Sequence, residues 1–143
     1  MEATALRVHA VRLTPGTDLK AELARLTQKL DLRAGFILSG IGSLYRARLR
    51  MPGGAGEADA FADFEEPMEI VSLAGTLGPD GLHAHLVLSR RDGSCVGGHL
   101  VAGCIVHTTV ELVIGEAEGL VFRRPVDPAT GYGELSVEQR DGG

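Results

Sequence analysis

The sequence predicts an α+β fold in which an antiparallel β-sheet is accompanied by one early amphipathic helix. Short runs of alternating apolar and polar residues recur along most of the 143 residues, and Gly-rich joints separate the later runs. Such short connections favour antiparallel pairing, because parallel strands need a crossover of a dozen or more residues. The length fits one domain, residues 1–143, with a core from about residue 5 to residue 135.

The first strand and the helix are expected within the first thirty residues. Residues 6–13 alternate as a half-buried strand does, and Pro15-Gly16 then breaks the chain. Thr17 is the expected helix N-cap, with Asp18 in the first turn, where a carboxylate favours the helix dipole. Apolar residues follow at spacings of four, three and four, at Leu19, Leu23, Leu26 and Leu30.

A second strand with an interruption is expected next, followed by a long irregular segment. Residues 35–38 and 44–51 have strand patterns, and residues 39–43 between them are expected to bend or break the strand. Residues 52–56 indicate a flexible loop, and the acidic run at residues 57–66 has little periodicity. Five further strands are expected over residues 70–77, 82–89, 95–101, 105–114 and 120–124.

Charge and composition limit the classes of function. The net charge is −5, from 14 Lys and Arg against 19 Asp and Glu, which disfavours direct DNA binding. No membrane span and no signal peptide are apparent, so we expect no membrane partner and a cytoplasmic location. Cys95 and Cys104 form neither a C-x-x-C pair nor a disulfide framework, and we expect both to be buried.

Three histidines in two neighbouring predicted strands are the candidate metal ligands. His83 and His85 share the face opposite four apolar residues, and they lie about 6.6 Å apart along the strand. His99 follows two glycines, which allow close approach of backbone or ligand. Three neutral imidazoles with an open fourth position suit Zn²⁺. The alternative is a polar strand face without chemistry.

Two other side chains could extend such a site. Glu111 and His107 share one face of the strand at residues 105–114, where Glu111 could orient an imidazole or act as an acid/base group. This permits a metal-dependent enzyme in which a zinc-bound water attacks a small substrate. A solvated face or a polar subunit contact is the alternative. A cupin is excluded, because Ser89 and Arg90 stand where its first motif needs Glu.

Arg46, Arg48 and Arg50 alternate along the second predicted strand and therefore share one face. Arginines in this pattern can contact phosphates or the carboxylates of a partner protein. They also discourage edge-to-edge aggregation, which is a purely structural role.

An ordered set of motifs resembles a known family. It comprises residues 15–19, 39–43 and 69–77, His83 with His85, Asp92-Gly93, residues 97–100 and 106–111, Arg124, Asp127-Pro128 and residues 130–132. Together these motifs extend from about residue 6 to residue 135 and resemble the plant and prokaryote conserved domain, called PPC or PCC.

The resemblance implies a homotrimeric α+β domain that acts as a binding or assembly module rather than an enzyme. It further implies a DNA-associated or transcription-associated role, protein partners, and a metal site where His83, His85 and His99 gather at the trimer. Two features depart from the plant members. The Arg-Gly-Arg-Pro core of an AT-hook is absent, and the contact segment for transcription factors is altered at residues 66–71.

Overall fold

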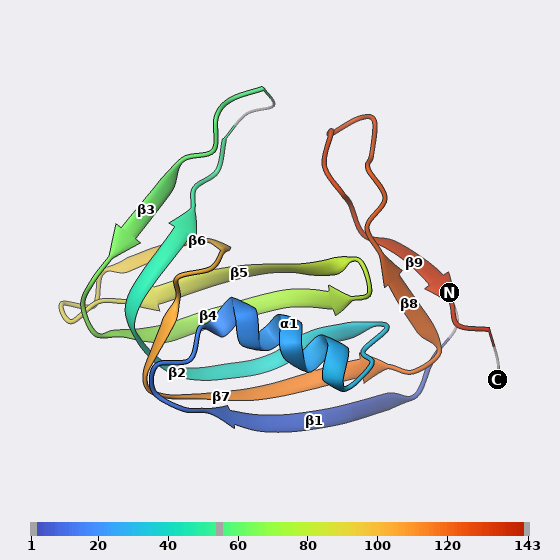
Figure 1. The fold of residues 1–143 in the computed structure, drawn as a ribbon, viewed down its shortest axis with the longest axis horizontal. Helices are drawn as coiled ribbons and strands as arrows, with labels where there is room; N and C mark the ends of the chain where they lie inside the picture. The colour runs from blue at the N-terminus through green and yellow to red at the C-terminus, as the bar shows by residue number, and fades with distance from the viewer. Residues whose placement is uncertain (1–2, 54–55, 142–143) are drawn as a thin grey trace.

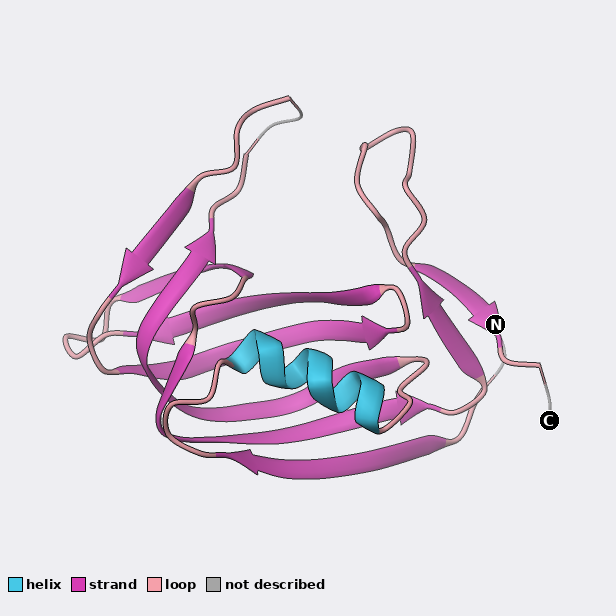
Figure 2. Cartoon of the chain, viewed as in Figure 1, coloured by secondary structure: helices cyan, strands magenta, loops and turns pink. Residues whose placement is uncertain are grey.

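The structure, a computed structural model, describes residues 3–53 and 56–141 as one strongly curved sheet, one helix and a small two-stranded ribbon (Figures 1 and 2). The elements in chain order are β1 (Leu6–Leu13), α1 (Leu19–Lys29), β2 (Gly35–Arg50), β3 (Phe61–Phe64), β4 (Met68–Gly78), β5 (Gly81–Ser89), β6 (Cys95–Leu100), β7 (Ile105–Ala117), β8 (Leu120–Arg123) and β9 (Ser136–Gln139).

The strand order of the sheet is β1-β7-β2-β4-β5-β6, with β3 attached to β2, while β8 and β9 form the separate ribbon. All pairings between these strands are antiparallel, as the short connections predicted. The far end of β2 also pairs with β6, through Leu49 with Leu100 and Arg50 with His99. The sheet therefore curls until the strand at its edge meets one at its centre.

Helix α1 packs on the concave face of the sheet, and its apolar stripe forms part of the core (Figure 1). Leu19, Leu23 and Leu26 are buried, as their spacing predicted. The predicted N-cap was wrong: Asp18, not Thr17, caps the helix and accepts a hydrogen bond from the Ala21 N–H at 3.0 Å. Within the described part of the chain, no helix is long and apolar enough to span a membrane.

Three sequence predictions for the strands need correction. Residues 39–43 were predicted to bend or break the strand; β2 runs through them without a break, and its pairing with β7 has three register shifts. Gly42 makes one of these shifts possible, since it has φ +145° and a Cβ there would lie 2.0 Å from the Thr109 carbonyl oxygen. The acidic run was expected to be irregular, yet it contains β3, and β9 was missed.

Two smaller predictions have separate outcomes. Cys104 is buried as expected, whereas Cys95 is exposed because it begins β6 directly after the turn. The predicted flexible loop at residues 52–56 is only partly described, since residues 54 and 55 lie outside the described ranges.

Candidate metal centre

The pairing of β5 with β6 brings the three predicted histidines together. His85 is directly opposite His99 in the register, and His83 is the next residue on the same face of β5. The ring centroids lie 4.9 Å apart for His83 and His85, 4.5 Å for His85 and His99, and 5.5 Å for His83 and His99. One nitrogen from each ring lies within 4.8 Å of the others, so the cluster forms within a single chain.

Local sequence explains why the three rings converge. The intervening residues Ala84 and Leu86 are buried in the core, which turns His83 and His85 to the opposite face. Gly98 lets β6 approach β2 closely, because a Cβ at this position would lie 2.8 Å from the Arg50 carbonyl oxygen. The glycine before His99 therefore has the packing role that its position in the sequence indicated.

The surroundings of His83 and His99 favour the neutral imidazole, which is the protonation state that binds metals. Burial lowers the pKa of His83 below its ordinary value, and the nearby Arg124 guanidinium lowers it further. Burial also lowers the pKa of His99, with the charge of Arg50 as the next cause. The Nε2 atoms of His83 and His85 lie 3.1 Å apart, so one neutral ring donates to the other.

A cavity of about 340 Å³ opens beside His83 and His99. Residues of two loops line it, the loop after β2 and the loop between β8 and β9, which both project upward in Figure 1. Arg50, Arg124, Tyr132 and Glu134 are among its polar lining residues. A small molecule in this cavity would touch two of the three candidate ligands.

His107 and Glu111 lie outside the histidine cluster. Both are exposed on β7, which β2 and β4 separate from β5 in the sheet order. The His107 ring lies 6.4 Å from the Tyr45 ring, and Glu111 is opposite Arg12 of β1. Within one chain the structure therefore does not bring these two side chains to His83, His85 and His99, and their suggested roles stay predictions.

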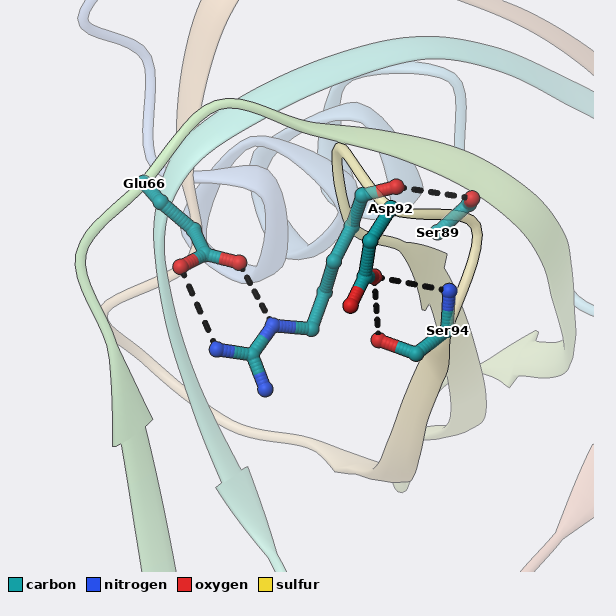
Figure 3. A network of polar contacts seen from close by, with 5 residues as sticks. Glu66, Ser89, Asp92 and Ser94 are labelled. Carbon is teal, nitrogen blue, oxygen red and sulfur yellow. Dashed lines mark hydrogen bonds and ion pairs between the residues drawn. The ribbon is translucent and has the colours of Figure 1, made fainter.

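His107 instead lines a second, larger cavity of about 860 Å³ at the other end of β5. Figure 3 shows the polar contacts at its rim, where the Glu66 carboxylate accepts hydrogen bonds from Nε and one terminal nitrogen of Arg90, at 2.6 and 3.3 Å. In the adjoining turn, Asp92 accepts hydrogen bonds from the N–H and the hydroxyl of Ser94. These acids and bases satisfy one another, so we assign no metal to this region.

The three arginines of β2 share one face, as predicted, and each one faces a carboxylate. The pairs and their N–O distances are Arg46 with Glu65 at 3.8 Å, Arg48 with Asp63 at 3.1 Å, and Arg50 with Asp59 at 3.4 Å. All three acids belong to the acidic run at residues 57–66, whose sequence has too little periodicity to predict a regular element. Sequence reasoning also did not assign Arg124 a place at the site, although it lies 3.3 Å from His83.

Solved structures with the same fold come from several prokaryotes. A hypothetical protein from Salmonella cholerae-suis is 40% identical and superposes with a TM-score of 0.90, covering 97% of this chain and 98% of its own. A metal-containing protein from Archaeoglobus fulgidus is 24% identical, with a TM-score of 0.81 and coverage of 95% and 99%. A candidate DNA-binding protein from Bacteroides thetaiotaomicron is 23% identical, with a TM-score of 0.81 and coverage of 94% and 98%.

Sequence comparisons identify curated relatives and a protein family. The bifunctional protein GlmU from a Synechococcus strain is 46% identical over 136 residues, which are 94% of this chain and 21% of that protein. The chain thus spans about a fifth of the length of the curated relatives that match it first. Residues 1–118 match the Plants and Prokaryotes Conserved domain. The chain therefore belongs to the Plants and Prokaryotes Conserved (PCC) domain family.

Proposed function

We propose that this chain is a PCC-domain binding module that holds a zinc ion at His83, His85 and His99. The observation that carries the proposal is the convergence of three imidazole nitrogens to within 4.8 Å of one another. A tetrahedral zinc ion with Zn–N bonds of about 2.0–2.1 Å needs its nitrogens roughly 3.3 Å apart. The rings therefore need only a small contraction, and a fourth position would stay open for water or another ligand.

The chemistry of the donor set fits a metal. The Nδ1 atom of His99 is buried and has no hydrogen-bond partner among the described residues. A buried polar atom without a hydrogen-bond partner lowers the stability of the fold. A metal ion could bind this nitrogen directly, or the ring could reorient when it binds a metal and so give the nitrogen a hydrogen-bond partner. The relative from Archaeoglobus fulgidus is itself described as containing metal, which agrees with the proposal.

Metal analysis of purified protein tests the site. Protein stripped with a chelator and dialysed against zinc should retain about one ion per chain. The double variant His83→Ala/His85→Ala should retain almost none, and His107→Ala, which removes an exposed histidine elsewhere, should bind like the parent. Equal zinc content in the double variant would sink the proposal.

We further propose that the module works as a homotrimer, assembled through the sheet face opposite α1. Large apolar side chains are exposed there on three strands: Val8 (54%), Leu38 (48%), Ile41 (61%) and Val71 (60%). A patch of this kind on a soluble chain marks a contact surface. The two other copies of the chain would cover it, as the family resemblance implies.

Light scattering coupled to size exclusion tests the assembly. The parent chain should elute with three times its 15.0 kDa mass. An Ile41→Lys variant should shift to the monomer, because a charge cannot be buried in an apolar contact without a partner. Lys substitution of the exposed Val126, which lies on the loop after β8, is the matched control. A parent protein that is monomeric at high concentration contradicts the proposal.

A metal-dependent enzyme is the second candidate, favoured by the cavity next to the open metal position. In that reading, His83, His85 and His99 would hold a metal that activates water, and the small substrate would bind between the two projecting loops. Glu134 lines this cavity together with His83 and His99, whereas Glu111 does not, so Glu134 is the better placed acid/base group. A fourth protein ligand closing the metal site would exclude this candidate.

Direct DNA binding receives less support from the charges. The net charge is −5, and the arginines of β2 already face carboxylates. We therefore propose that a DNA-associated role would operate through partner proteins. We also propose that the chain is cytoplasmic. Titration of duplex DNA at two salt concentrations tests the point, since phosphate contacts give a steep salt dependence.

A further inference from the structure

Arg124 follows β8 and extends into the cavity beside the histidine cluster. A terminal nitrogen of its guanidinium lies 2.7 Å from the Gly133 carbonyl oxygen and 3.3 Å from Nδ1 of His83. Among the ion pairs formed by the described residues none involves Arg124, whereas the adjacent Arg123 faces both Asp80 and Glu138. Arg124 therefore presents a half-buried positive charge that has no carboxylate within ion-pair distance among the described residues.

The contact with His83 has a consequence for metal binding. A guanidinium has only N–H donors, so Nδ1 of His83 must accept, and a neutral ring then carries its proton on Nε2. A metal bound through Nδ1 would take the lone pair that Arg124 now uses. A metal bound through Nε2 would move the proton to Nδ1, where it would oppose the Arg124 donor. In both cases metal loading releases Arg124 from His83.

The charges around the loaded site would then favour an anion. A zinc ion on three neutral imidazoles keeps its two positive charges, and the released guanidinium adds a third. Three carboxylates and a second guanidinium also line the cavity: Glu57, Glu134 and Asp59, which lies 3.4 Å from Arg50. Together with the zinc ion and Arg124 they leave one net positive charge. An incoming anion is the group that balances this charge and fills the open metal position.

We infer, on the basis of the proposed metal site, that Arg124 is the anion-binding residue of that site. Its ligand is a small carboxylate or phosphate, with one oxygen on the metal and another on the guanidinium. An arginine matches such groups because its planar fork places two parallel N–H donors on two oxygens. The cavity of about 340 Å³ has the size of a small-molecule site.

Cobalt(II)-loaded protein allows the metal and the anion to be followed separately. Acetate and inorganic phosphate are titrated in separate arms while the visible spectrum reports the cobalt coordination. At least one of these anions should change the spectrum saturably, and the stronger arm assigns the ligand to carboxylates or phosphates. The variant Arg124→Met should keep its cobalt and bind that anion at least tenfold more weakly. Arg91→Met, which removes an exposed arginine in the β5–β6 turn, should match the parent.

The outcomes separate the two proposals. Equal anion affinity in Arg124→Met and the parent overturns the role of Arg124 and leaves the metal site standing. Failure of the parent protein to bind cobalt overturns both. Loss of cobalt from Arg124→Met alone would make Arg124 a support for the histidines, which also overturns the inference. Cobalt affinity that equals or exceeds the parent's supports the release of Arg124 on loading.

Discussion

The histidine cluster of β5 and β6 and the arginine row of β2 both arise from strand alternation. They differ in the charged groups that surround them. The histidines have no carboxylate among their described hydrogen-bond partners, and cationic side chains lie nearby. Each arginine faces an acid from the segment around β3. Alternation thus fixes which residues share a face, and the neighbouring elements decide whether that face remains available to a ligand.

The largest expected difference between the two sets is the stabilisation that added zinc provides. A ligand that binds only the folded state at one hundred times its dissociation constant stabilises that state by about 2.7 kcal/mol. The parent and Arg48→Met should both gain an amount of this order in urea unfolding with zinc. His99→Ala should gain almost no stability from zinc, because the two imidazoles that remain are too few to hold the ion tightly. Similar gains in all three proteins would remove the distinction between the cluster and the row.

Much of the fold could be predicted from the sequence, because hydrophobic alternation is a local property. The bounds of β1 were predicted residue for residue, and the face of β5 that carries His83 and His85 was correct. Strand β3 was missed because four residues in an acidic run carry too little apolar pattern. A bend or break at residues 39–43 was predicted, but the positions of the β2 bulges were not, because they depend on the register of β2 against β7, which is a long-range property.

The three histidines of the candidate site could be predicted from the sequence, but the side chains around them could not. Strand period and family resemblance together selected three histidines, and they converge in space. The place of Arg124 could not be predicted, because the loop between β8 and β9 brings it back to a strand some forty residues earlier. The acidic partners of the arginine row were hidden for the same reason, since the pairing of β2 with β3 brings them into range.

A smaller effect is expected when the metal-free protein is acidified. The pKa values of His83 and His99 lie below the ordinary value of 6.5, chiefly through burial. Between those lowered values and 6.5 the unfolded chain binds more protons, so stability falls with falling pH there and is unaffected above it. The double variant His83→Gln/His99→Gln should flatten this dependence in urea unfolding, and His107→Gln should not. An unchanged slope in the double variant would show that burial does not disfavour the charged rings.

The smallest effect is expected in the arginine row. The Arg48 guanidinium lies 3.1 Å from Asp63 and 4.6 Å from the Phe61 ring centroid, and its side chain is 44% exposed. An exposed ion pair contributes about 0.2–1 kcal/mol, so a double-mutant cycle with Arg48→Met and Asp63→Asn should give a coupling in that range. The coupling should fall in 1 M salt, where the screening length is about 3 Å. A parallel cycle with Phe61→Leu should keep its smaller coupling in salt, because the ring carries no net charge. A coupling of several kcal/mol between Arg48 and Asp63 would instead mean that the row is a tightly built site comparable to the histidine cluster.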